Sequence, residues 1–388
     1  MKSNNREGAL FVLLLLLTST VAQSQVNPAL NAPDEVAWKL FIQVNTATGG
    51  TNALFETWAS DTDTFQASPH FPSHATPIAP HPPIVPTAGF AAMRRAGRLV
   101  PPLPTSSKVG EESRRNKQDF DFIVLHDLYK VSGLQAAFGK DISFPIDAIE
   151  IKASWVALSD IPSFTNNRVN IVDVPRLYHV SIGSGGKQYA LVSMHIISKL
   201  VPNWTWATFE HWLNPARCDI LACIDRFGAQ TQVVSPNAQP GQGYPPCAKS
   251  AALSALIAAA HWDPAFTNYC LKGSQTDFSD NTGLPVRLGN SVIEDGFVDR
   301  SSCMTCHGRS GFDASGQRTS DAGFDVNGAP VGSIHPSWFW SFSSQPPIFP
   351  RTPGLTRIAT PSDFVWSIPF CAFDDTINPP RKSACIGK

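Results

Sequence analysis

Short hydrophobic segments alternate along the chain with stretches rich in proline, glycine and serine. Apolar side chains recur at helical spacing between residues 34 and 42, directly after Pro33, which predicts a short amphipathic helix. Residues 248–260 are rich in alanine and leucine and predict a second helix. The pattern over residues 290–307 predicts a third helix, although Gly296 lies within it.

The middle of the chain carries strand patterns. Residues 148–156 partly alternate between apolar and polar side chains and end in residues that favour strands. Residues 177–182 and 188–197 flank the glycine-rich segment 183–187, which is typical of a β-hairpin. Together these patterns predict an α+β fold, with a sheet-rich body and a helical or irregular C-terminal region.

Prolines and turn-forming residues divide the chain further. Residues 69–104 hold ten prolines, which excludes regular structure through most of that stretch and predicts a long loop. Residues 229–245 are again rich in turn formers. We therefore expect a body over residues 23–286 and a C-terminal region over residues 287–388, packed together as one unit. The 43% of hydrophobic residues is typical of a globular protein.

The first 22 residues resemble an export signal. Lys2 and Arg6 precede an unbroken apolar run from Ala9 to Leu17, and Thr20 and Ala22 fit the small-residue positions before a cleavage site. The run is shorter than the roughly 20 residues that cross a bilayer, although an uncleaved anchor helix is the alternative. We expect cleavage near Ala22 and a periplasmic or secreted protein without stable membrane insertion. The net charge of −1 predicts no attraction to nucleic acid.

Eight cysteines fit an oxidising compartment. Two of them belong to the motif described below, and the even number that remains favours disulfides. We expect local pairs, namely Cys218–Cys223, Cys247–Cys270 and Cys371–Cys385. A metal site is the alternative, but no Cys-x-x-Cys pair remains among these six cysteines.

The strongest chemical signal is the segment Cys303-Met304-Thr305-Cys306-His307. Two thiols one helical turn apart can add to the two vinyl groups of one porphyrin, and the adjacent histidine then becomes a ligand of the iron. A redox Cys-x-x-Cys and a zinc half-site are the alternatives. The first favours a βαβ context and the second needs a partner pair, and the sequence offers neither. The motif therefore predicts one covalent haem c, held by Cys303, Cys306 and His307.

The sequence does not identify the ligand on the opposite side of the iron. No methionine follows the motif, which argues against the His/Met ligation of many small cytochromes. The candidates are Met194, His195, His211, His261 and His335. Met194 and His195 are neighbours on a predicted strand, so their side chains point to opposite faces and at most one approaches the iron. We favour His195. An empty sixth position is the alternative.

Several segments resemble exported bacterial single-haem proteins of the cytochrome c family. In that family the pattern reads approximately His-Ile-x-x-Lys, a short gap, and then Trp-x-Trp-Ala/Ser-Thr-Phe-Glu-His. Here the corresponding segments are residues 195–199 and 204–211, and the stretches 37–41, 149–155 and 287–291 are also similar. The resemblance implies a haem protein outside the cytoplasm and no particular activity.

The same block predicts the surroundings of a haem. Its aromatic residues predict an apolar wall beside the porphyrin, formed by Trp204, Trp206, Phe209 and Trp212. Cationic side chains are candidate partners of the haem propionates, namely Lys199, Arg287, Arg94, Arg95 and Arg98. The alternative is an aromatic core with an ion pair between Lys199 and Glu210 at the edge of the sheet.

Three functions follow from these alternatives. We favour electron transfer to a redox partner protein, with His307 and His195 as iron ligands. An enzyme of the peroxidase or oxygenase type would use His195, Glu210 or His211 as an acid or base beside an open iron position. A sensor of a small-molecule ligand such as nitric oxide is the third possibility. The length of the chain favours the last two, whereas the single motif favours the first.

Overall fold

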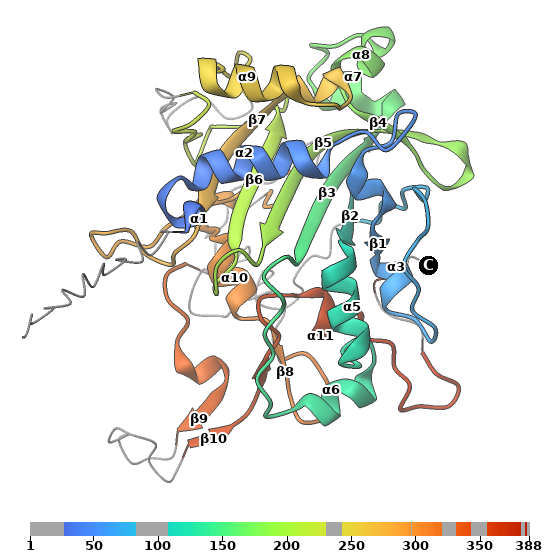
Figure 1. The fold of residues 1–388 in the computed structure, drawn as a ribbon, viewed down its shortest axis with the longest axis vertical. Coiled ribbons are helices and arrows are strands. Elements are labelled where there is room, and N and C mark those ends of the chain that lie inside the picture. The colour runs from blue at the N-terminus through green and yellow to red at the C-terminus, as the bar shows by residue number, and fades with distance from the viewer. Residues whose placement is uncertain are drawn as a thin grey trace, which may run out of the picture.

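An antiparallel sheet of seven strands forms the centre of the molecule (Figure 1). The computed structural model describes residues 27–82, 108–229, 243–295, 297–319, 331–342, 355–381 and Cys385. The strand order is β1-β2-β3-β5-β6-β7, and β4 pairs with β5. The strands are β1 (Ala59–Ser60), β2 (Val109–Arg115), β3 (Ile149–Ala157), β4 (Val180–Ile182), β5 (Gln188–Ser198), β6 (Thr205–His211) and β7 (Tyr269–Gln275). The predicted strand at residues 148–156 and the predicted hairpin are both confirmed, as β3 and as β4 with β5.

Two predicted helices, α2 (Pro33–Val44) and α9 (Ala251–Ala259), are confirmed, and α2 crosses one face of the sheet (Figure 1). Pro33 begins α2, where its missing N–H costs nothing, and Asp34 and Glu35 in the first turn favour the helix dipole. The other α-helices among the described residues of the body are short: α1 (Pro28–Asn31), α3 (Asp61–Thr64), α5 (Lys117–Leu125), α6 (Val131–Ala137), α7 (Ile161–Phe164) and α8 (Val174–Leu177).

The face of the sheet beneath α2 is apolar. Alternate residues of the central strands point toward the helix, among them Ile151, Met194 and Phe209, and all three are buried. Phe41 of α2 stacks on Phe209 with a ring-centroid distance of 4.1 Å. This packing buries the apolar stripe of α2 and accounts for its position across the sheet.

The C-terminal region contains only short elements within its described residues. These are α10 (Cys303–Gly308), α11 (Ser367–Cys371), β8 (Gly311–Phe312) paired with β11 (Thr360–Pro361), and β9 (Trp340–Phe342) paired with β10 (Leu355–Arg357). A second core joins this region to the body, because Ile197 and Trp206 of the sheet pack with Met304, Phe312 and Ile368. The structure therefore has the predicted α+β fold.

The predicted helix over residues 290–307 is wrong before Cys303. Residues 291–295 form turns, because the Asn290 carboxamide accepts hydrogen bonds from the backbone N–H groups of Val292 and Ile293 at 2.9 and 3.3 Å. Such local bonds from an asparagine side chain compete with helical hydrogen bonds. A short 3-10 helix follows at Val298–Arg300, and the only α-helix among the described residues of this stretch is α10, which begins at Cys303.

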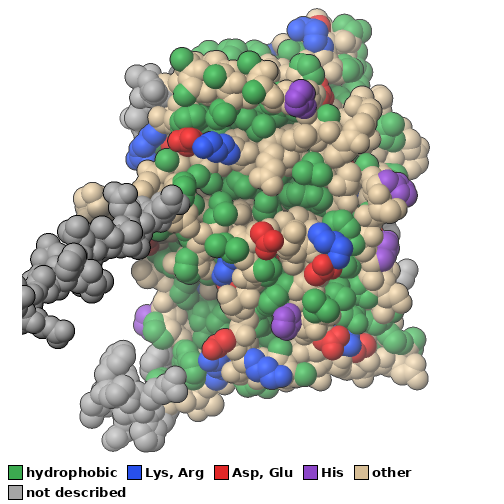
Figure 2. Space-filling view, viewed as in Figure 1, with side chains coloured by type: hydrophobic (Ala, Val, Ile, Leu, Met, Phe, Trp, Pro, Cys, Tyr) green, Lys and Arg blue, Asp and Glu red, His purple; other side chains and the backbone are tan. Residues whose placement is uncertain are grey.

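The three expected disulfides are present, joining Cys218 to Cys223, Cys247 to Cys270, and Cys371 to Cys385. Among the described residues, no helix is long and apolar enough to cross a membrane. Figure 2 shows few and scattered charged groups on the visible face, in keeping with the 16% of charged residues. The predicted signal at residues 1–22 and the cluster of Arg94, Arg95 and Arg98 lie outside the described residues.

Candidate functional site

The face of the sheet opposite α2 is polar although it is largely buried. Strand pairing places Ser113, Lys152, His195 and Thr208 in one row across β2, β3, β5 and β6. A neighbouring row holds Glu111, Ser154, Ser193 and Glu210, and the row on the other side holds Arg115, Glu150, Ile197, Trp206 and Gln275. A buried polar face requires hydrogen-bonding partners, because unpaired polar groups are costly to bury.

The segment before α10 supplies many of these partners. The Ser291 N–H donates to Glu210 Oε1 at 2.8 Å, and the Asn290 carboxamide donates to Thr208 Oγ1 at 2.8 Å. Gln275 donates to Ser302 Oγ at 2.9 Å and accepts from the Met304 N–H at 3.2 Å. These bonds fix the start of α10 against β6 and β7.

The motif residues share one face of α10. Cys303, Cys306 and His307 stand at positions i, i+3 and i+4, which lie together on a helix surface. Cys303 and Cys306 are the two cysteines that form no disulfide. Burial raises the pKa of Cys306 to about 12 and raises that of Cys303 well above its ordinary value, so both sulfurs are thiols near neutral pH. Met304 is buried in the second core, as is Cys303.

His307 is held at one nitrogen. Its Nδ1–H donates to the Phe364 carbonyl oxygen at 2.9 Å, and no described residue forms a hydrogen bond with its Nε2. The Trp206 ring lies 4.6 Å from the imidazole centroid. Burial lowers the pKa of His307 to about 3, with smaller contributions from His195 and Lys152. The imidazole is therefore neutral near pH 7, which leaves a lone pair on Nε2.

Charged groups of the polar face lie near the motif. His195 Nε2 is 3.0 Å from Glu294 Oε1, so the imidazole donates to the carboxylate, while the buried His195 Nδ1 has no hydrogen-bond partner among the described residues. Burial alone would raise the pKa of Glu294, but His195 lowers it. Lys152 pairs with Glu111 at 2.7 Å and affects the pKa of both Cys306 and His307.

Other predicted site residues have different partners. Lys199 Nζ binds Asp363 Oδ1 at 2.6 Å and the Pro202 carbonyl oxygen at 2.8 Å, and Glu210 lies 3.5 Å from Lys272. The alternative interpretation, an ion pair between Lys199 and Glu210, is therefore wrong. The four predicted wall residues do not form one wall, because Trp204 and Trp206 belong to the second core, Phe209 faces α2, and Trp212 packs in a third cluster.

The other candidates for the sixth ligand either have different surroundings or are exposed. Met194 faces α2, as its alternation with His195 predicted. His211 stacks on Tyr178 and uses both nitrogens, with Nε2–H donating to the Leu177 carbonyl oxygen at 3.0 Å and Nδ1 accepting from the Leu213 N–H at 3.2 Å. His261, His335 and Arg287 are exposed. The structure therefore brings His195, Trp206 and His307 together and leaves His211 outside this group.

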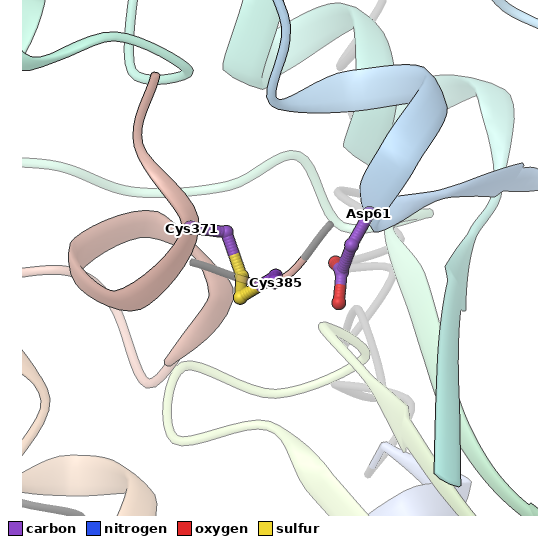
Figure 3. A group of neighbouring side chains, drawn as sticks. All are labelled: Asp61, Cys371 and Cys385. Carbon is purple, nitrogen blue, oxygen red and sulfur yellow. A yellow bond between two sulfur atoms is a disulfide. The ribbon is translucent and has the colours of Figure 1, made fainter. Parts of the chain in front are cut away.

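A group of possible metal ligands elsewhere does not form a metal site. Asp61, Cys371 and Cys385 place one oxygen and two sulfurs within 4.8 Å of one another (Figure 3). The two sulfurs are joined in a disulfide, whereas metals bind the thiolate form of cysteine. Asp61 is also paired with the buried Arg115 at 2.5 Å. The group is therefore structural.

Sequence reasoning missed Lys152, Glu294, Asp363 and Phe364. The alternation in β3 marked Lys152 as a polar position, but such positions usually face solvent, and only the tertiary structure covers this face. Phe364 acts through its backbone carbonyl oxygen, a group that every residue has, so the residue type gives no sign of this role. Searches against protein-family models, curated proteins and solved structures found no match to this chain.

Proposed function

We propose that the chain is an exported c-type cytochrome that carries one covalent haem at Cys303 and Cys306, with His307 as an iron ligand. The division of the cysteines carries this proposal, because six form disulfides and the other two stand one turn apart in α10 beside His307. Attachment of haem c requires two such thiols and the adjacent histidine. The resemblance to exported single-haem cytochromes points the same way.

The residues around α10 fit this group. The Phe364 carbonyl oxygen fixes the tautomer of His307 and leaves Nε2 for the iron. Trp206 and the second core offer an apolar surface to a porphyrin. When bound, the haem supplies one-electron exchange at its iron. The chain would hold the ring through two thioether bonds, orient the imidazole and limit the access of water.

We favour electron transfer, with His195 on the opposite side of the iron and a redox partner protein as the electron donor or acceptor. His195 lies on the polar face near His307, and Glu294 fixes one of its nitrogens. Its other nitrogen is buried without a hydrogen-bond partner among the described residues, which favours a further ligand for this imidazole.

A haem enzyme or a small-ligand sensor is the second candidate. Lys152, His195 and Glu294 together exceed what a simple electron carrier needs beside its iron. An imidazole bonded to a carboxylate can hold or move a proton, so an open iron position would give these side chains a role in acid–base chemistry. Glu210, bound to Ser291 and Lys272, would act only as a support.

Export to the periplasm or outside the cell completes the proposal. Haem c attachment in bacteria occurs outside the cytoplasm, and the three disulfides also favour an oxidising compartment.

The test is to produce the full chain in a bacterial host that attaches haem c in its periplasm. We expect a haem that survives denaturation and acid–acetone extraction, with a pyridine haemochrome spectrum typical of two thioether bonds. Replacing both Cys303 and Cys306 by alanine removes the covalent haem. The matched control, C218A/C223A, deletes a disulfide with a sequence separation of only 5 residues and retains the haem. A wild-type protein that loses all haem on extraction would refute the proposal.

A further inference from the structure

The Phe364 carbonyl oxygen reaches His307 from a strained turn. Asp363 and Phe364 have φ angles of 49° and 73°, in the left-handed region that residues other than glycine rarely adopt. Such a conformation is costly and persists only where its surroundings enforce it. The turn directs the Phe364 carbonyl oxygen to His307 Nδ1 at 2.9 Å.

A buried ion pair holds this turn. Lys199, directly after β5, contacts both carboxylate oxygens of Asp363 at 2.6 and 2.7 Å. Each of these side chains is only 8% exposed. The Phe144 N–H also donates to Asp363 Oδ2 at 2.8 Å, and the Pro202 carbonyl oxygen accepts from Lys199 at 2.8 Å.

The surroundings of Lys199 are also constrained. Its ammonium lies 5.6 Å from the centroid of the Trp204 ring, and Trp204 itself has a φ of 59°. Left-handed backbone conformation is therefore found at Asp363 of the ion pair, at its neighbour Phe364, and at Trp204 beside Lys199. Strain of this kind concentrates at sites where a particular geometry is needed.

We propose that Lys199 and Asp363 are positioning residues for His307, which hold the Phe364 carbonyl oxygen against its Nδ1 and so set the strength of the imidazole as an iron ligand. This inference rests on the proposed haem at α10. A hydrogen bond from Nδ1–H makes the other ring nitrogen a better donor, which stabilises ferric over ferrous iron. Loss of the pair should therefore raise the reduction potential.

The sign of the shift separates this role from a simple charge effect. Removing the Lys199 cation would by itself favour the more positive ferric iron and lower the potential. Loss of the hydrogen bond acts in the opposite direction. A change of Asp363 to Glu keeps the charge but lengthens the side chain, so it should displace the turn and raise the potential without a charge effect.

The experiment is spectroelectrochemical titration of the haem-loaded protein and its variants. K199M and D363E should each give a roughly tenfold larger ferrous-to-ferric ratio at a fixed applied potential, a shift of about 59 mV for one electron. K199R keeps a cation at this position and should give a reduction potential between those of K199M and the wild type. The matched control is K249M, because Lys249 also binds a backbone carbonyl oxygen and lies 4.7 Å from a tryptophan ring, Trp38, on the opposite side of the sheet.

Each outcome decides the inference. A potential that rises in K199M and D363E but not in K249M supports it. A fall in K199M, or an unchanged potential in D363E, overturns it while leaving the haem proposal intact. Should K199M fail to fold, D363E alone decides. A wild-type chain without covalent haem refutes the proposed function instead, so the two failures are distinguishable.

Discussion

His195 on β5 and Glu294 in the segment before α10 are joined by a hydrogen bond of 3.0 Å. The bond connects the polar face of the sheet to the segment that leads into α10, the helix of Cys303 and Cys306. Both side chains affect the pKa of His307, so under the proposed function their state would also affect a ligand on the opposite side of the iron. Within the proposed function, the pair is therefore where experiments should distinguish an electron carrier from an enzyme or sensor.

We predict that H195A converts low-spin iron to high-spin iron in the haem-loaded protein, because it removes the second nitrogen ligand. Optical spectra of the ferric and ferrous forms, with and without carbon monoxide, measure this change. The exposed His261 provides the control, since H261A should leave the spectrum unchanged. A wild-type ferrous spectrum that already shifts with carbon monoxide would instead favour the open-site functions. A spectrum that is the same in H195A and wild type would remove His195 as a ligand.

Thiol counting provides a test that does not depend on the state of the iron. The haem-free, denatured chain should show two reactive thiols without reductant and eight after reduction, since three disulfides hold the others. The haem-loaded chain should show none before reduction, because thioether bonds consume both motif thiols. More than two thiols in the unreduced, haem-free chain would contradict the disulfide pattern.

The apolar face of the sheet predicts a large stability effect at Phe209. Its ring is fully buried and stacks on Phe41 at 4.1 Å, so F209A should lower the free energy of unfolding by about 3–5 kcal/mol. Chemical denaturation measures the loss. As a control, L125A changes a side chain that is 81% exposed and should stay within about 0.5 kcal/mol of wild type. A small loss in F209A would mean that this core repacks readily.

The sequence correctly predicted the elements whose apolar or turn-forming residues face the environment that such residues favour. Helix α2 has an apolar stripe against the sheet, and the glycine-rich turn between β4 and β5 requires the positive φ of Gly185 and Gly186. The same reasoning failed at residues 290–302, where the side chain of Asn290 bonds to the backbone and prevents a helix. A single side-chain bond of this kind decides between turn and helix, and the apolar pattern does not report it.

The parts of the site that depend on residue types and their spacing were predictable from the sequence. The motif cysteines and the local disulfides follow from spacing, and alternation along β5 separated His195 from Met194. The partners of Lys199 and His195 were not predictable, because Asp363 and Glu294 reach them across 164 and 99 residues of chain. The polar face of β3 also looked like a solvent face, since its cover comes from the C-terminal region.

A second buried cluster of ionisable groups lies apart from the motif. His179 Nδ1 is 3.0 Å from Asp263 Oδ2, its Nε2 is 3.3 Å from Glu56 Oε2, and the Ser181 hydroxyl donates to Glu56. Ser181 Oγ also lies 3.3 Å from His179 Nε2, so a serine, an imidazole and an aspartate adjoin as in serine hydrolases, but here the hydroxyl donates its proton to Glu56. Glu56 and His179 are fully buried, and the imidazole can form ion pairs with the carboxylates of both Glu56 and Asp263.

This cluster predicts how stability depends on pH. Burial alone would lower the pKa of His179, but Asp263 and Glu56 raise it above its ordinary value of 6.5. Burial alone would raise the pKa of Glu56, but His179 lowers it below 4.5. The histidine therefore contributes stability that is complete below pH 6.5 and is lost as the pH rises through its folded pKa. The glutamate contributes stability that is present above pH 4.5 and is lost as the pH falls through its folded pKa.

We predict that H179Q lowers the free energy of unfolding most between pH 4.5 and 6.5, by about 3 kcal/mol, because the substitution leaves the buried Glu56 without its cation. The difference from wild type should shrink at higher pH, where wild-type His179 loses its proton, and at lower pH, where Glu56 gains one. Urea denaturation of both proteins across this range measures the difference. H261A provides the control, because an exposed histidine should give a small difference that does not vary with pH. A loss in H179Q that is constant across the range would show that His179 is neutral in the folded protein and acts through packing alone.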